Sequence, residues 1–124
     1  MRIIGEINPK HFENVFTIST NDVVITEKQI EHIKERHPQV YELYIKYIPE
    51  VLKYPDYILQ ANKPNSAVLI KSFTENGEHF QLVLRLKAPD DPTEYQNSII
   101  TFWKISESDL KRLTRNKKIL YKSR

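Results

Sequence analysis

The chain has 124 residues, a formal net charge of +3 and no cysteine. Its length suits one domain, which buries roughly two-thirds of the surface that the unfolded chain exposes. The lack of cysteine excludes disulfides, thiolate metal sites and thiol nucleophiles, so chemistry falls to His, Lys, Arg, carboxylates and hydroxyls. Because no run is apolar enough for a membrane span or a signal peptide, we expect a single cytoplasmic domain over residues 1–124.

Basic side chains are concentrated at the C-terminus. Residues 111–124 hold seven of the 19 Lys and Arg residues and no acid, which leaves 12 basic against all 16 acidic side chains in the rest of the chain. Such a basic tail can raise association rates with a polyanion. A solvated helix end followed by a terminus explains it equally well.

The first half of the chain has mostly helical patterns. They predict a leading strand near residues 3–4, a short strand over 23–25, and helices over 26–36, 39–47 and 50–53. Pro38 ends the first of these helices. Because proline disfavours helical geometry at the preceding residue, we expect His37 to lie at a backbone break.

The second half alternates with a period of two, which is typical of strands. The predicted strands cover residues 57–60, 67–73, 80–87 and 97–105, and Asn76-Gly77 predicts a hairpin between the second and the third. A last short helix over 106–113 and a small edge strand over 119–121 follow. Helices first and consecutive strands later indicate an α+β domain with an antiparallel sheet.

One histidine lies in the first predicted helix and another directly follows it. His32 and His37 are five residues apart, which puts them roughly 140° apart around a helix axis, so they do not form a metal-binding pair. His32 and Arg36 share one face, where they could bind an anion or form a solvated surface pair. His37 falls on the apolar stripe of its helix, so a packed core histidine is the alternative to a functional one.

Two cations and two hydroxyls fall in the predicted strands. Lys71 and Arg85 would form an anion site if they share a face of the sheet, and Ser98 or Thr101 could add a hydroxyl donor. In a regular strand Ser98 and Thr101 point to opposite faces, so we expect at most one of them in that site. The alternative is that both cations face solvent.

Three segments and two basic residues occur in an order that resembles a known family. Residues 25–38 (ITEKQIEHIKERHP), 48–56 (IPEVLKYPD) and 97–101 (NSIIT), with Lys71 and Arg85 between the last two, are similar to phage-associated nuclease domains. These domains are grouped with barnase, EndoU, the tRNA-cutting colicins and RelE. The resemblance covers about residues 22–122.

The resemblance implies the barnase-EndoU-colicin-RelE (BECR) fold, in which N-terminal helices pack on a four-stranded antiparallel β-sheet. It also implies ribonuclease activity without a metal or other cofactor, on tRNA or another structured RNA. By the same resemblance the active-site candidates are His37, Lys71 and Thr101, followed by His32, Arg85 and Ser98.

These residue types suit RNA cleavage by the ribose 2′-hydroxyl. The reaction needs a base, an acid for the leaving 5′-oxygen and cations around the phosphorane, and it yields a 2′,3′-cyclic phosphate. Two alternatives remain open, which are an inactive RNA- or protein-binding module on the same fold and an enzyme acting on another phosphate ester. A toxin-like role would require a neutralising immunity or antitoxin protein as a partner.

Overall fold

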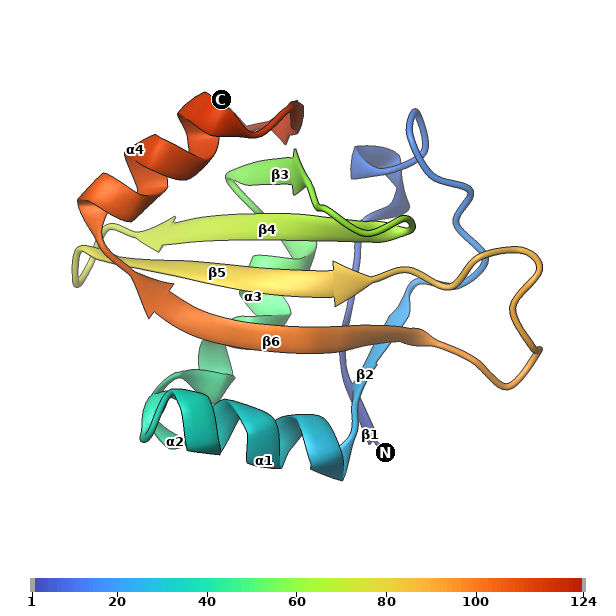
Figure 1. Ribbon diagram of the computed structural model, residues 1–124, viewed down its shortest axis with the longest axis horizontal. Coiled ribbons are helices and arrows are strands. Elements are labelled where there is room, and N and C mark those ends of the chain that lie inside the picture. The colour runs from blue at the N-terminus through green and yellow to red at the C-terminus, as the bar shows by residue number, and fades with distance from the viewer. Residues whose placement is uncertain (1, 124) are drawn as a thin grey trace.

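The computed structural model describes residues 2–123 and forms a mixed seven-stranded sheet with helices on both faces (Figure 1). The strands are β1 (Arg2–Glu6), β2 (Asp22–Ile25), β3 (Tyr57–Gln60), β4 (Ser66–Phe73), β5 (Glu78–Arg85), β6 (Asn97–Ile105) and β7 (Ile119–Lys122). The helices are α1 (Glu27–Arg36), α2 (Val40–Tyr44), α3 (Ile48–Lys53) and α4 (Glu107–Asn116), with 3-10 turns η1 (Pro9–His11) and η2 (Ile45–Tyr47).

The sheet is wider than the four antiparallel strands that were expected. Its order is β1-β2-β6-β5-β4-β3-β7, and β2 pairs with β6 in parallel while the other neighbours are antiparallel. The expectation of four strands was wrong because β1, β2 and β7 are short and join the central strands through contacts far apart in the sequence. Local periodicity does not report such pairings.

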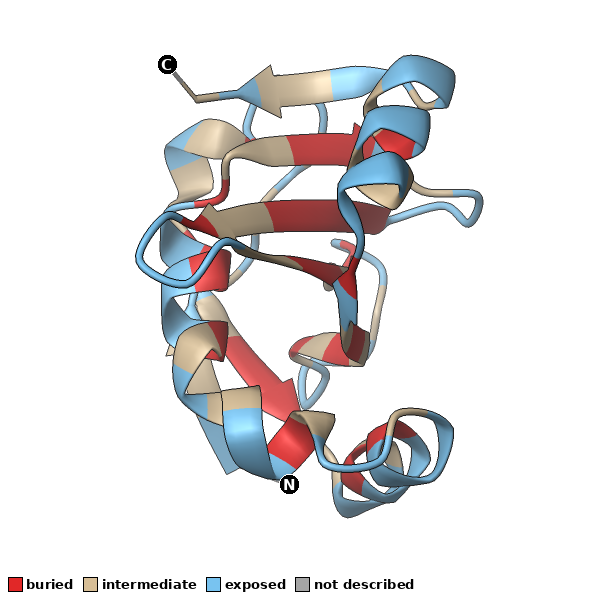
Figure 2. Cartoon of the chain, turned by 90° about the vertical axis from the view of Figure 1, so that its left-hand side faces the viewer, coloured by how far each residue is buried: buried red, intermediate tan, exposed pale blue. Residues whose placement is uncertain are grey.

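Helices α1, α2 and α3 cover one face of the sheet. The alternating residues Phe80, Leu82 and Leu84 of β5 point to this face and are fully buried, together with Ile33 of α1 and Leu52 of α3. Figure 2 shows that the buried residues gather on the central strands and on the inner sides of these helices. This face therefore holds the larger core.

The other face is only partly covered. Leu113 of α4 packs in a smaller cluster with Leu59, Val68 and Ile70, which lie on β3 and β4. The neighbouring part of β5 and β6 has no helix over it in Figure 1. We call this part the open face and define it by Gln81, Val83, Arg85, Ser98, Ile100, Thr101 and Trp103.

The local signals in the sequence explain the ends of the main elements. Thr26 accepts a hydrogen bond from the Gln29 backbone and begins α1, and Ser106 and Asp109 form a reciprocal capping box at the start of α4. Gly77 has a φ of 68° in the β4–β5 turn, a conformation that costs glycine little. The predicted hairpin and the predicted starts of α1 and α4 are confirmed, whereas α3 begins at Ile48 and not at residue 50.

Candidate active site

A β-bulge in β6 brings Ser98 and Thr101 to the same face of the sheet. Ser98 lies opposite Arg85 and Thr101 lies opposite Val83, whereas Ile99 lies opposite Leu84. Ile100 is therefore an extra residue, and it reverses the alternation between the two hydroxyls. The expectation that at most one of them could belong to a site with Arg85 was wrong for this reason.

Arg85 extends over the open face and is partly engaged by Asp91. Its guanidinium donates to the Asp91 carboxylate at 2.9 and 3.3 Å and to the Leu86 carbonyl at 2.8 Å. Hydrogen bonds from Arg85 and from the Ala88 backbone hold the pKa of Asp91 below its ordinary value. The Arg85 side chain keeps 35% of its surface exposed, so it can still contact an anion beside Ser98.

His37 ends α1 at the margin of the open face. Its backbone N–H donates to the Ile33 carbonyl at 2.8 Å, and its φ and ψ of −135° and 75° are not helical, as Pro38 predicts. The imidazole stacks on Trp103 with ring centroids 5.2 Å apart. Because residues two apart on a strand are separated by about 7 Å, Thr101 is the next side chain along β6 from this stack.

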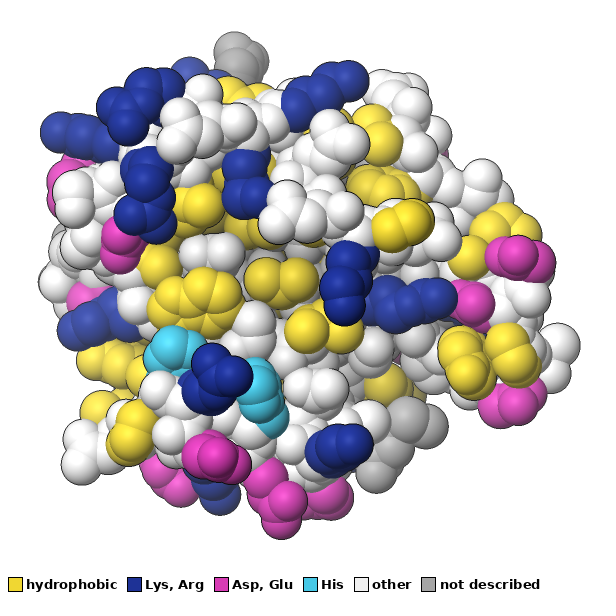
Figure 3. Space-filling model, in the orientation of Figure 1, with side chains coloured by type: hydrophobic (Ala, Val, Ile, Leu, Met, Phe, Trp, Pro, Cys, Tyr) yellow, Lys and Arg dark blue, Asp and Glu magenta, His cyan; other side chains and the backbone are white. Residues whose placement is uncertain are grey.

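Burial lowers the pKa of His37 below 6.5, and the positive charges of Arg36 and His32 lower it further. Both neighbours are exposed on α1. Near neutral pH the His37 ring is thus mainly uncharged, so a ring nitrogen can accept a proton. The histidines and basic side chains around the apolar centre of this face are visible in Figure 3.

Lys71 lies apart from this group. It is the cross-strand partner of Phe80, which points to the helix-covered face, whereas Arg85 is on the open face. The Lys71 ammonium lies 3.5 Å from the Asp56 carboxylate and 4.0 Å from that of Glu50. The structure therefore places Arg85, Ser98 and Thr101 on one face with His37 at its margin, leaves His32 exposed on α1, and separates Lys71 from them.

Two residues with specific side-chain contacts, Trp103 and His79, were not identified from the sequence. Trp103 is the single tryptophan of the chain, two positions after Thr101 on a predicted strand, and this position was the available signal. His79 hydrogen-bonds Ser72 at 2.6 Å and pairs with Glu107 at 2.8 Å, which ties β4 and β5 to the first turn of α4. No pattern in the sequence linked His79 to Glu107.

Asn97, the first residue of the NSIIT segment, holds the site in place. Its buried amide accepts from the Lys87 backbone at 2.8 Å and donates to the carbonyls of Thr20 and Asp22 at 2.8 and 3.0 Å. These bonds tie β6 to β2 and to the end of β5. Within residues 2–123, no three His, Asp or Glu side chains converge as a metal site, and no helix has the length and apolar character of a membrane span.

Comparison with known proteins gives one family. No curated protein and no solved structure matches the chain significantly. The model of the family described as phage-Barnase-EndoU-ColicinE5/D-RelE like nuclease 2 matches residues 1–122, so the relationship begins well before residue 22 and includes β1 and β2. The chain belongs to this family of phage BECR-like nucleases.

Proposed function

We propose that the protein is a metal-independent endoribonuclease whose active site is the open face. The observation that carries the proposal is a sheet surface that bears Arg85, Ser98 and Thr101, with His37 stacked on Trp103 at its margin. Nuclease family membership supports a nucleic-acid substrate. A ribose 2′-hydroxyl can serve as the nucleophile, which makes RNA the expected substrate.

His37 would act as the general base. It takes the 2′-hydroxyl proton while the 2′-oxygen bonds to phosphorus, and the bond from phosphorus to the 5′-oxygen breaks. Arg85 would balance the charge that develops on the phosphorane, and the hydroxyls of Ser98 and Thr101 would donate to its oxygens. The products are a 2′,3′-cyclic phosphate and a 5′-hydroxyl end.

His32 is our candidate for the acid that protonates the leaving 5′-oxygen. It lies on α1, five residues before His37, and its exposure allows contact with substrate. Lys71 is not part of the proposed site, because it lies on the opposite face. A toxin-like role, tRNA as the substrate and a neutralising partner protein are extensions of the same proposal.

The test is incubation of the purified protein with total RNA, followed by mapping of the new ends. We expect cleavage of RNA and not DNA, no inhibition by EDTA, and cyclic phosphate ends. A requirement for added Mg²⁺, or equal cleavage of DNA, would contradict this mechanism.

A second candidate is an RNA- or protein-binding module without catalysis. The observation in its favour is the Asp91 carboxylate, which neutralises part of the Arg85 charge that the transition state would need. Binding of RNA without cleavage, unchanged in the His37→Gln variant, would favour this module.

A further inference from the structure

A hollow in the described structure adjoins the open face and has a volume of about 680 Å³. Val83 and Ile100 of the open face form its apolar floor. The loop between β3 and β4 forms its outer wall, with Asn62, Lys63 and Asn65. Arg85 also lines it, so the hollow is continuous with the proposed active site.

The walls of this hollow are held by the fold. Ile100 is present on the floor because it is the extra residue of the β6 bulge. Asn65 has a left-handed φ of 56°, and its carbonyl accepts a hydrogen bond of 2.7 Å from the Leu86 backbone. The loop is thereby tied to the end of β5. A ligand would meet a formed cavity and would not have to order the loop first.

The surroundings of the loop between β3 and β4 carry positive charge. Two more hollows surround the same loop, and Lys63, Lys117 and Lys118 contribute to the three linings, none of which contains an Asp or Glu among the described residues. Two further hollows in the described structure include Asp56 and Lys71 and lie near the helix-covered face. The hollow beside the open face thus combines an apolar floor with a rim that is basic and holds no acidic side chain among the described residues.

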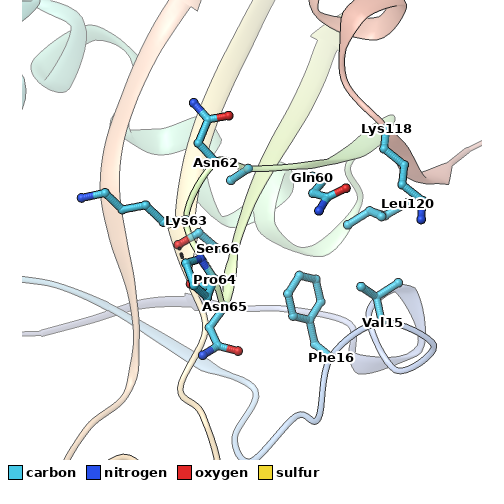
Figure 4. Close-up of a pocket in the computed structure, with 11 residues that line it drawn as sticks. Val15, Phe16, Gln60, Asn62, Lys63, Pro64, Asn65, Ser66, Lys118 and Leu120 are labelled. Atoms are coloured by element: carbon cyan, nitrogen blue, oxygen red, sulfur yellow. Dashed lines mark hydrogen bonds between the residues drawn. The ribbon is translucent and has the colours of Figure 1, made fainter.

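The loop itself presents basic groups in two directions. Figure 4 shows Lys63 pointing away from Lys118, which precedes β7 and lies with Leu120 on the other side of the loop. Lys117 reaches the loop as well, because its ammonium donates to the Asn62 side chain at 3.4 Å. A polyanion that leaves the open face over this loop would thus meet lysines on both sides of it.

We propose that the hollow binds one unpaired nucleobase of the RNA, next to the scissile phosphate, and that the backbone continues over residues 61–65 towards Lys117 and Lys118. The base lies flat on Val83 and Ile100, and the Asn62 amide contacts its edge. A base in a duplex is stacked and paired and cannot enter, so the substrate class is an unpaired RNA segment. This inference rests on the proposed function.

The experiment uses four fluorescent oligoribonucleotides of one length that differ only in the base beside the cleavage site. We expect the wild-type protein to prefer one base by roughly tenfold or more in kcat/KM, the scale of one good base contact. Asn62→Ala, and Ile100→Trp as a filling variant, should reduce the preference to about twofold. Asn14→Ala, an exposed amide outside the hollow, should keep it.

A second arm tests the backbone path and the unpaired state. Lys63→Ala should reduce the slope of log KM against log salt concentration by about one, the value for loss of one phosphate contact. Lys10 is an exposed lysine of η1, and Lys10→Ala should leave this slope unchanged. The same oligonucleotides annealed to their complements should resist cleavage. Equal cleavage of duplex, or a base preference that survives in Asn62→Ala, would overturn the subsite.

Measurements of RNA binding test the nucleobase subsite independently of the ribonuclease activity. If the wild-type protein cleaves none of the oligonucleotides, the ribonuclease proposal fails, and the subsite is judged by the Kd of uncleavable 2′-O-methyl versions. A base preference in Kd that Asn62→Ala abolishes would support the subsite. Absence of binding, or a preference unaffected by Asn62→Ala, would reject it.

Discussion

The imidazole of His37 lies nearly parallel to the indole of Trp103, with an interplanar angle of 9° and ring centroids 5.2 Å apart. This stack joins the end of α1 to the open face of β6, although the two residues are 66 positions apart in the sequence. It fixes the plane of the imidazole beside Thr101. It also supplies part of the burial that lowers the pKa of His37.

The first prediction concerns the stack. Trp103→Leu removes the aromatic surface, so the pKa of His37 should rise towards 6.5 and kcat should fall roughly tenfold, because the base loses its fixed orientation. Trp103→Phe should keep most of the activity, since a ring remains available for stacking. The measurements are an NMR titration of the His37 ring and steady-state kinetics. An unchanged titration in Trp103→Leu would show that the indole does not set the environment of His37.

The second prediction is the effect of pH through His37. Its pKa is lower in the folded protein than in the unfolded chain, so the unfolded chain binds more protons as pH falls below 6.5. The free energy of unfolding should therefore decrease as pH falls through that range, and His11, whose pKa burial also lowers, acts in the same direction.

His37→Gln should abolish cleavage, shift Tm at neutral pH by only a few degrees, and weaken this loss of stability in acid. Urea unfolding of both proteins at several pH values measures the effect. A Tm lowered by tens of degrees at neutral pH would instead make His37 a structural residue.

The third prediction is that Asn97 stabilises the fold. Asn97→Ala leaves the Lys87 backbone N–H and two carbonyls without their partner in a buried site, which should cost about 2–4 kcal/mol. Tm should fall by roughly 10 °C in a domain of this size. Asn14→Ala, an exposed amide, is the control and should stay within about 0.5 kcal/mol of wild type. Equal stability of the two variants would mean that these bonds are replaced by water.

The candidate site was only partly predictable from the sequence. Alternation predicted β5 and β6 and put Arg85 on the polar side of β5, but it left the choice between Ser98 and Thr101 open. The extra residue Ile100 brings both hydroxyls to one face. The adjacent apolar residues Ile99 and Ile100 break the alternation at the position of the bulge, although the adjacent pair Phe102-Trp103 breaks it again without one. The stack of His37 on Trp103 depends on how α1 meets the sheet, and this long-range contact leaves no periodic signal.

The fourth prediction separates Lys71 from catalysis. Its ammonium pairs with Asp56, whose carboxylate also accepts from the Ser72 backbone at 2.8 Å, on the face away from the open face. Lys71→Ala should lower Tm by a few degrees, because a partly buried pair is broken, and leave kcat/KM within about threefold of wild type. The measurement is kcat/KM of the variant and of wild type, each corrected for the fraction of folded protein. A loss as large as that of His37→Gln would return Lys71 to the active site.

The last prediction concerns the basic C-terminal segment. Residues 107–116 form α4 and residues 119–122 form β7, which pairs with β3, so truncating this segment would remove a strand of the sheet. The contribution of the positive charge of α4 is better tested by a double variant, Lys111→Gln with Arg115→Gln, because both side chains are exposed. If α4 attracts RNA at long range, the pair should weaken binding and reduce the salt slope by up to about two units, with kcat unchanged, since fewer counterions are released. Glu107 pairs with His79, so Tm must be followed to show that α4 stays in place. An unchanged slope in a folded double variant would confine RNA binding to the open face and the loop at residues 61–65.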